Sequence, residues 1–451
     1  AHGDAGDITI NAATVRLDEG SSLSSMALDI GRSGDVTVTG ENIQLDGRAY
    51  ISSTTDATQW AGRFGIFDST YDRDIDQNGS ITLAGENVTL TGGAYLKSTT
   101  RMPHRQAGSI ALTGGQIDLT GGSSVISNTE PSAMIDAWRQ HLKLTGPAGF
   151  GDAGEVTVNA AQVNITDKSR LASDSFTDGN AGRIAITSDE VAITEIGRVY
   201  AGALNEGDGG AIEIEAGQLR LAKRGAIVAD VRDSGDGGTV HIKADEMIVD
   251  GASVYGSTSG EGQGSRVKIN SGDLRLAKGG RIESAAFGLG QAGELEINAS
   301  RVSIVGEGEW FDPKDVDAEP SGEIARSGLV TGTVAEGDAG TIHLTTPDLD
   351  LDAGLIGSAS TGTGEAGSIN VNITGQMVLQ NDGQVSVRSS QADGGDITIN
   401  TSGHVLVDNS ELSASAKQDG GSVRLYGDGN FFFRDGSITA EAGQDGGNIS
   451  V

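Results

Sequence analysis

One short stretch of the chain has the residue types and the spacing of a calcium loop. Asp74, Asp76 and Asn78 place hard oxygen atoms at alternate positions, and Gly79 follows them as a turn residue. A calcium loop of the helix–loop–helix type would also need a bidentate glutamate at position 85, which is a glycine, and Glu86 comes one residue late. Two hypotheses therefore stay open for Asp74, Asp76 and Asn78: a Ca²⁺ site, or a solvated loop.

Other residue types that carry chemistry are scattered or belong to a repeated unit of the chain. His241 and His343 fall at the same position of that unit, but we expect them about 14 Å apart, which is too far for one metal ion. The chain has no cysteine, so disulfides and thiol nucleophiles are excluded. Aspartates recur beside glycines, and we interpret them as structural caps of corners rather than catalytic carboxylates. These aspartates are Asp4, Asp35, Asp152, Asp208, Asp236 and Asp338.

Aromatic side chains gather in three segments that interrupt the repeat, at about residues 56–77, 130–149 and 306–326, and all three tryptophans fall in them. The first two segments should leave the repeat at the same corner, and the third at the preceding one. Within the second segment, Ser132–Leu144 has helix-like apolar spacing, and we expect a short amphipathic helix there.

The aromatic side chains either pack on the outer wall as small local cores or form a contact surface for a glycan or a protein. The second hypothesis follows because aromatic faces stack on sugar rings and anchor interfaces. The candidate binding residues are Trp60, Phe64, Tyr71, Trp138, Trp310 and Phe311.

The composition limits the fold and the partners. Glycine accounts for 70 of the 451 residues, proline for only 6, and aromatic residues for 4 %. Such a chain has few large side chains, so we expect a thin core of Val, Ile and Leu that is repeated many times. The net charge of −32 makes nucleic acid and anionic membrane surfaces unfavourable partners. No apolar run is long enough for a membrane-spanning helix.

The repeated unit is clearest at Gly151–Ala160, GDAGEVTVNA. A glycine corner leads into a short strand in which Val156 and Val158 point to one side and the residues between them to the other. Most successive corner glycines are 26 to 29 residues apart, and the three longer intervals contain the three aromatic segments. A second apolar pair follows each first pair, and a third, looser strand rich in Ser, Ala and Thr completes the unit.

Short strands separated by short corners cannot form hairpins with a matching register throughout, but they can form the turns of a coil. We therefore predict an all-β fold: a right-handed parallel β-helix (solenoid) with three strands per turn and about 14–15 turns. It would be one continuous domain over residues 1–451 with three loop insertions. Glycines would permit positive φ at the corners and a close approach of stacked turns. Asparagines that follow the first strand would stack their amides, at Asn11, Asn159, Asn270, Asn298, Asn372 and Asn400.

The two ends of the sequence show no special features. The chain begins at Ala1 without a methionine or a signal peptide, and the repeat runs to both ends without a capping sequence. We therefore expect a processed product or a piece of a longer protein, because open ends of a solenoid would expose unpaired strand edges. Such edges would also permit end-to-end self-association, and lateral self-association of the solenoids is the alternative.

The unit, as in GDAGDITINAATVRLDEGSSLSS and GDAGEVTVNAAQVNITDKSRLAS, resembles the repeats of filamentous-haemagglutinin-like exoproteins. The two-partner secretion system of Gram-negative bacteria and cyanobacteria exports these proteins. The resemblance covers nearly all of the chain except the three insertions, and the family's N-terminal secretion domain is not found in this sequence. It implies a β-helical filament that an outer-membrane partner secretes to the extracellular face of the cell. Its role would be in adhesion, aggregation or biofilm, or as the stalk of a contact-delivered toxin.

The function expected first is a structural and adhesive stalk segment that does no catalysis, holds no cofactor beyond a possible Ca²⁺, and presents its insertions to glycans or cell-surface proteins. One alternative is a subunit of a self-assembling extracellular fibre or sheath. The other is a carbohydrate-active β-helix enzyme, a polysaccharide lyase or hydrolase. Carboxylates that converge in one outer groove would favour the enzyme, and rods that stack without a ligand would favour the fibre.

Overall fold

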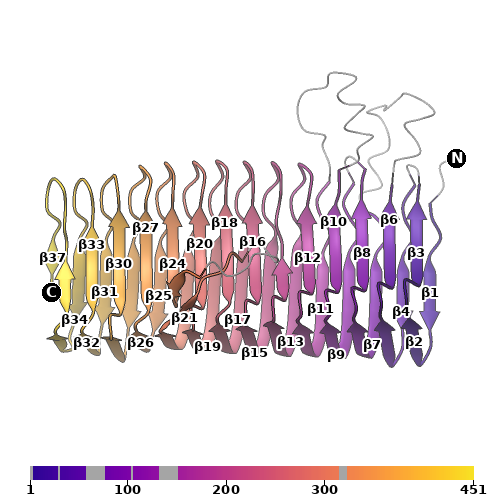
Figure 1. Ribbon diagram of the computed structural model, residues 1–451, viewed down its shortest axis with the longest axis horizontal. Helices are drawn as coiled ribbons and strands as arrows, with labels where there is room; N and C mark the ends of the chain where they lie inside the picture. The colour runs from indigo at the N-terminus through magenta and orange to yellow at the C-terminus, as the bar shows by residue number, and fades with distance from the viewer. Residues whose placement is uncertain (1–3, 29–30, 57–76, 103–104, 132–150, 314–321) are drawn as a thin grey trace, which may run out of the picture. The chain divides into compact units, whose positions relative to one another are not determined.

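The computed structural model describes residues 4–28, 31–56, 77–102, 105–131, 151–313 and 322–451. These residues form a parallel β-solenoid of about 14 turns, and they contain no helix (Figure 1). The predicted fold class is confirmed, while the right hand of the coil stays a prediction. Residue contacts divide the chain into two compact units, which are Ala1–Ala192 with Gly197–Glu213, and Ile193–Ile196 with Ile214–Val451. One continuous domain over residues 1–451 likewise stays a prediction.

In the first unit, each turn contributes to two parallel sheets. The first two strand positions of a turn lie in what we call the first sheet, and the third lies in the second sheet. The strands of the first sheet are β1 (Ile8–Asn11), β2 (Thr14–Leu17), β4 (Val36–Thr39), β5 (Asn42–Leu45), β7 (Ile81–Leu90), β9 (Ile110–Leu119) and β11 (Val156–Ile165). Those of the second sheet are β3 (Ser22–Ala27), β6 (Tyr50–Thr55), β8 (Tyr95–Thr100), β10 (Ser124–Thr129), β12 (Arg170–Ser175) and β14 (Arg198–Tyr200).

The second unit repeats this arrangement, and the boundary between the units falls within β13 (Arg183–Thr194) and β15 (Ala211–Ala222). Its first-sheet strands are β17 (Thr239–Asp250), β19 (Arg266–Ala277), β21 (Leu295–Val305), β25 (Ile342–Thr346), β26 (Asp348–Asp352), β28 (Ile369–Ile373), β29 (Gln376–Gln380), β31 (Ile397–Thr401), β32 (His404–Asp408), β34 (Val423–Gly427), β35 (Phe431–Arg434) and β37 (Ile449–Ser450). Its second-sheet strands are β16 (Ala226–Val231), β18 (Ser253–Thr258), β20 (Arg281–Ala286), β24 (Gly328–Thr333), β27 (Leu355–Ser360), β30 (Gln384–Ser389), β33 (Glu411–Ser415) and β36 (Ser437–Thr439).

The expected three strands per turn need one correction. In several turns the first two strands run on as a single strand of 10 to 12 residues, as in β7 and β19. In β7, Ile81 and Leu83 point inward, and so do Val88 and Leu90. The odd spacing between Leu83 and Val88 reverses the alternation of faces, so the chain bends there while the ladder to the neighbouring strand continues. The corner is present, but it does not interrupt the strand.

Equivalent residues of successive turns are paired in register. Val36 lies between Ile8 and Ile81, and Val371 lies between Leu344 and Ile399. Because equivalent positions stack, the inward aliphatic pairs form a narrow core, and most of these side chains have no exposed surface. Burial of each such side chain contributes roughly 1.5–3 kcal/mol before the entropy of ordering is subtracted.

The corner glycines are required for close approach and not for positive φ, which corrects one expectation. Gly340, Gly367 and Gly395 are absent from the positive-φ residues. A Cβ atom on Gly367 would lie 2.0 Å from the carbonyl oxygen of Gly340, and one on Gly395 would lie 1.6 Å from that of Gly367. Positive φ occurs instead at the corner between the second and third strands, mostly at residues other than glycine, such as Lys223 (49°) and Arg224 (66°).

Buried serines of the second sheet bond to these corners. Ser127 Oγ donates to the carbonyl oxygen of Gly108 (2.8 Å) and accepts from the amide of Gly154 (3.0 Å), so one hydroxyl joins the corners of two turns. A buried carbonyl without a partner would cost about 1–3 kcal/mol. The same serine-to-glycine-carbonyl bond is made by Ser25, Ser53, Ser98, Ser173 and Ser358.

Five of the six corner aspartates named in the sequence analysis act as caps, as predicted. Asp35 Oδ1 accepts a hydrogen bond from the amide of Ser80 at 2.7 Å, and Asp152 Oδ1 accepts one from the amide of Asn180 at 2.9 Å. Asp4, Asp236 and Asp338 bond in the same way to the amide of the next turn. The predicted amide stacking is present at Asn270 with Asn298 and at Asn372 with Asn400, while the register sets Asn11 beside Thr39 and Asn159 beside Thr113.

A membrane-spanning helix, meaning one that is long and apolar enough to cross a bilayer, is not found in the described residues.

The close stacking of corners gives a first testable prediction. Gly367→Ala should lower the free energy of unfolding by about 3 kcal/mol, because its methyl group would overlap the Gly340 carbonyl oxygen. The matched control is Gly446→Ala, where an added Cβ atom meets nothing within 4 Å. Urea denaturation followed by circular dichroism measures both variants. Equal midpoints for Gly367→Ala and Gly446→Ala would contradict the role given to the corner glycine.

Candidate functional site

Most of the residues that the sequence singled out lie outside the described residues. This applies to Asp74 and Asp76, to the expected helix at Ser132–Leu144, and to four of the candidate aromatic residues. The structure describes Asn78, Trp310 and Phe311. The four aromatic residues outside the description are Trp60, Phe64, Tyr71 and Trp138.

Asn78 is a structural residue of a corner. Its side chain is buried; Oδ1 accepts a hydrogen bond from Thr55 Oγ1 (2.6 Å), and Nδ2 donates one to the carbonyl of Thr99 (3.0 Å). Its amide oxygen is therefore already engaged, and the calcium hypothesis now depends on Asp74 and Asp76. Among the described residues, no group of three or more His, Asp or Glu side chains could hold a metal ion.

The first two insertions leave the solenoid from the same edge, as predicted. Thr55, Thr100 and Thr129, which end β6, β8 and β10, are neighbours in register. Between the two insertions, Arg101 binds both flanking carboxylates, those of Asp56 and Glu130, each at 2.7 Å. Burial disfavours the charged form of Glu130, but hydrogen bonds from Lys97 and Arg101 and their charges outweigh it, so the pKa of Glu130 lies below its ordinary value.

The third insertion begins as a hairpin at the predicted corner. Gly306 follows β21 with a φ of 66°, and β22 (Glu307–Glu309) then pairs antiparallel with β23 (Ile324–Arg326). The amide of Trp310 donates to the carbonyl of Glu323 at 2.8 Å, which extends the pairing by one step. The hairpin fixes the backbone at Trp310, and so determines where the next side chains go.

Phe311 anchors the insertion on the wall, by which we mean the outward-facing surface of the stacked strands. Its side chain is only 6 % exposed, and the guanidinium carbon of Arg224 lies 5.7 Å from the centre of its ring. This is a cation–π geometry, worth about 0.5–2 kcal/mol. The burial of Phe311 therefore agrees with the first of the two hypotheses for the aromatic residues, that they pack as small local cores on the outer wall.

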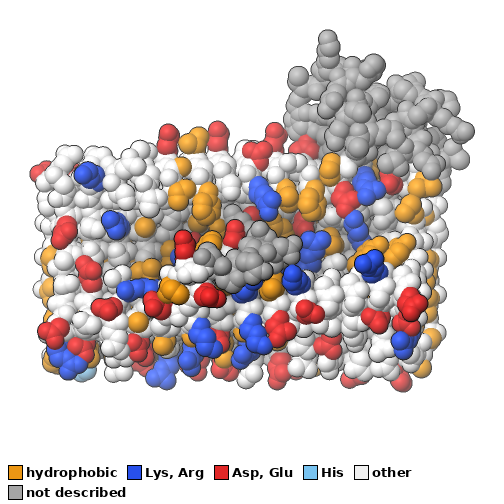
Figure 2. Space-filling view, viewed as in Figure 1, with side chains coloured by type: hydrophobic (Ala, Val, Ile, Leu, Met, Phe, Trp, Pro, Cys, Tyr) orange, Lys and Arg blue, Asp and Glu red, His pale blue; other side chains and the backbone are white. Residues whose placement is uncertain are grey.

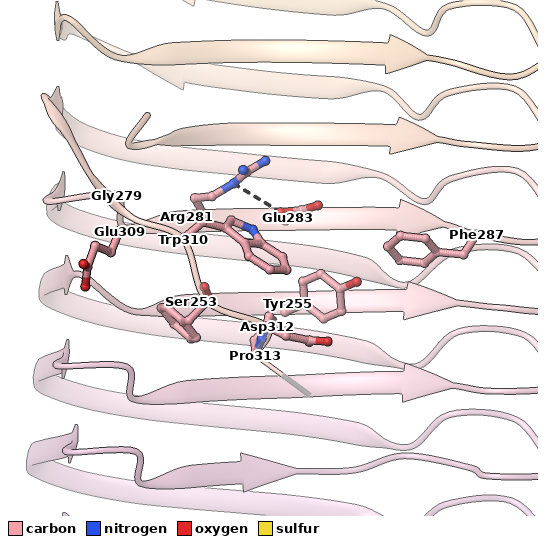
Figure 3. Close-up of a pocket in the computed structure, with 11 residues that line it drawn as sticks. Ser253, Tyr255, Gly279, Arg281, Glu283, Phe287, Glu309, Trp310, Asp312 and Pro313 are labelled. Atoms are coloured by element: carbon pink, nitrogen blue, oxygen red, sulfur yellow. Dashed lines mark ion pairs between the residues drawn. The ribbon is translucent and has the colours of Figure 1, made fainter. Parts of the chain in front are cut away.

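Trp310 is placed differently, because it lines a pocket of about 210 Å³ in the second unit (Figure 3). Tyr255 comes from β18, Arg281 and Glu283 come from β20, and Phe287 follows β20. In Figure 3 the indole of Trp310 lies over these strands, between Arg281 and Tyr255, and Phe287 stands apart on the far side. The remaining lining residues are Ser253, Gly279, Glu309, Phe311, Asp312 and Pro313.

The polar groups of the pocket are partly shielded from water. Arg281 Nε and Glu283 Oε2 are 3.2 Å apart, and each side chain is 19 % exposed. Tyr255 is buried, and this burial, together with the charge of Glu283, raises the pKa of its phenol well above the ordinary value. The phenol therefore stays protonated near neutral pH and keeps a hydroxyl that can donate. Figure 2 shows hydrophobic side chains among basic and acidic ones on the face that carries the hairpin.

Sequence reasoning found Trp310 but missed the residues across the pocket from it. Tyr255 and Glu283 lie on adjacent strands as a register pair, in turns that follow the repeat without interruption. A signal was present, since Tyr255 occupies an outward strand position where the previous turn has Val228, and Phe287 occupies a corner that is usually small or polar. A large aromatic residue at an outward strand position indicates a part of the solenoid surface that another segment covers, and Tyr255 is buried in this way, whereas Phe287 is 43 % exposed.

The ion pairs between the first two insertions give a second prediction. Arg101→Gln should lower the free energy of unfolding by about 1–2 kcal/mol at pH 7, since these groups are half-buried. The folded-state pKa of Glu130 is lowered, so its stabilisation is present above its unfolded pKa of about 4.3 and is lost as the pH falls through the folded value.

Urea denaturation of the parent and of Arg101→Gln at pH 7 and pH 3 measures this difference. The control is Arg170→Gln, at an exposed arginine for which the described residues show no ion pair. A difference between parent and Arg101→Gln that is as large at pH 3 as at pH 7 would contradict the assignment.

The chain was compared with protein-family models, with curated proteins and with solved structures. No family model, curated protein or solved structure matches it. The resemblance to filamentous-haemagglutinin-like exoproteins therefore rests on the repeat unit alone.

Proposed function

We propose that this chain is a structural and adhesive stalk segment of a filamentous-haemagglutinin-like exoprotein, displayed at the bacterial cell surface. It does no catalysis, and it presents its insertions to glycans or cell-surface proteins. An outer-membrane partner would export it, as the resemblance of the repeat implies. The net charge of −32 agrees with partners other than nucleic acid.

One observation supports this proposal above the others: the wall continues past an insertion without a change in register. Arg281 of β20 pairs with Gly328 of β24, although the third insertion separates their turns. The first sheet also continues, with Val302 of β21 paired to Leu349 of β26. The polar groups of the corners bond to the next turn, and all three tryptophans of the sequence fall in the insertions. This division between scaffold and contact surface suits a stalk that displays binding segments.

The two alternatives lead to different observations. A self-assembling fibre or sheath subunit would form ordered assemblies of this chain without any other component. A polysaccharide lyase or hydrolase would release sugar fragments from a polymer. The proposed stalk would do neither, and would attach to a surface through its insertions.

The adhesive proposal predicts that attachment depends on the three tryptophans. The triple variant Trp60→Ala, Trp138→Ala and Trp310→Ala should bind at least tenfold less to immobilised cells and polysaccharide surfaces than the parent, because tryptophan side chains anchor many such contacts. Circular dichroism should show the same solenoid in both proteins. Equal attachment of the parent and the triple variant would overturn the contact role of the insertions.

A deletion tests the independence of scaffold and insertion. Removal of residues 307–326 would join Gly306 to Ser327 and leave two residues between Val305 and Gly328. The corner between Asp250 and Ser253 has the same length, and Gly251 there has a φ of 57°. We expect the shortened chain to keep the parent's circular dichroism and to melt within about 5 °C of it. Loss of the cooperative transition would show that the insertion is part of the wall.

A further inference from the structure

We propose that the pocket beside Trp310 binds a single pyranose ring of a neutral hexose or a hexosamine, at the end or the side of a glycan. The inference deepens the proposed function and rests on it, since it names the ligand class that one of the insertions would contact. It depends on the shape of the pocket, on its polar pair and on its charge.

The aromatic walls fit a sugar ring. Trp310 comes from the hairpin and is half-buried, Tyr255 lies beside it on β18, and Phe287, 43 % exposed, stands across the opening (Figure 3). The C–H face of a pyranose stacks on such aromatic faces, which bury apolar area and still permit polar contacts at the ring edge. The volume of about 210 Å³ lies below the roughly 300 Å³ at which drug-sized sites begin, so one ring fits and a longer ligand must extend outside.

The polar pair fits adjacent hydroxyl groups. Arg281 supplies only donors and Glu283 supplies only acceptors, and their nearest atoms are 3.2 Å apart. A hydroxyl group both donates and accepts, so two neighbouring hydroxyls can donate to Glu283 and accept from Arg281 at the same time. The ion pair holds both side chains in place before a ligand arrives, which lowers the entropy lost on binding. Asp312, at the edge of the pocket, offers a second acceptor.

The charge of the pocket selects among sugars. Among the described lining residues there are three carboxylates, Glu283, Glu309 and Asp312, and a single cation, Arg281, and the chain as a whole carries −32. A sugar carboxylate or sulfate would meet carboxylates that are only partly screened by water, and this repulsion opposes binding. A neutral hexose meets no such repulsion, and the ammonium group of a hexosamine would be attracted. We therefore expect acidic sugars to bind more weakly than neutral ones of the same shape.

The wall fixes the positions of these groups. Tyr255 and Glu283 are partners in the register of β18 and β20, so the ladder sets their separation. Phe311, packed under Arg224, holds the hairpin that carries Trp310. The site is thus held by regular strands on one side and by an anchored hairpin on the other, an arrangement that keeps a binding site in shape before the ligand enters.

The experiment uses the whole chain with Trp60→Phe and Trp138→Phe, so that Trp310 is the only source of indole fluorescence. The probes are methyl glucopyranoside, methyl galactopyranoside, glucosamine and glucuronate, added up to about 50 millimolar, as suits the weak binding of one ring. We expect a saturable change in fluorescence with at least one neutral sugar or glucosamine, and a response to glucuronate that is at least fivefold weaker.

Saturation-transfer NMR on the same sugars then compares variants of the parent chain. Trp310→Ala and Glu283→Gln should each weaken binding at least fivefold, while Phe432→Ala, at an aromatic residue that is 53 % exposed elsewhere in the second unit, should leave it unchanged. The proposal would be overturned if none of the four sugars binds, if glucuronate binds as strongly as the glucoside, or if Trp310→Ala binds as strongly as the parent.

The outcomes also separate this inference from the adhesive function. If the triple tryptophan variant loses surface attachment but no sugar binds the pocket, the adhesive function holds and the sugar ligand is wrong. If sugars bind and the triple variant still attaches like the parent, the pocket is confirmed as a sugar site and the adhesive role of the insertions is wrong.

Discussion

The stacking of one corner glycine on the carbonyl group of the glycine one turn before is the contact on which the wall depends. It brings two backbones closer than any side chain allows, because a Cβ atom added to Gly367 would lie only 2.0 Å from the Gly340 oxygen. The buried serine hydroxyls then satisfy the carbonyl groups that this approach removes from water. With the corners fixed, the aliphatic pairs of each turn fall directly over those of the last, and the core follows.

The stacked strands of the solenoid determine the positions of most residues of the candidate site. Tyr255, Arg281 and Glu283 are ordinary strand residues whose positions the ladder sets, while Trp310 reaches them from a hairpin that Phe311 anchors. The first of the two hypotheses for the aromatic residues, a small local core, fits Phe311, while the contact role of its neighbour Trp310 stays a prediction. Phe311 belongs to a small local core, and Trp310 forms the wall of an open pocket. The buried Phe311 thus holds the half-buried Trp310 in position.

The stacked turns of the solenoid could be predicted from the sequence because the residues that determine them are local and repeated. The spacing of Gly154, Gly182 and Gly210, with an apolar pair two residues after each, predicted parallel turns and the inward faces. It did not predict that β7 would continue through a corner as one strand, because this depends on hydrogen bonds to the strands of neighbouring turns. Trp310 was found because it breaks the repeat, whereas Glu283 was missed because it obeys it. Glu283 lies next to Tyr255 because the two residues are one repeat period apart in the sequence and successive turns are stacked.

The corner at which the hairpin joins has a consequence for how such chains change over time. Val305 and Gly328 pair with the same strand positions as the equivalent residues of turns without an insertion. The pairing of the later turns therefore does not depend on the length of the intervening loop. If the deletion of residues 307–326 leaves the solenoid intact, loops at this corner are free to differ in length and sequence while the core sequence stays the same. Such a chain could then gain or lose a surface loop one corner at a time, with the same scaffold beneath it.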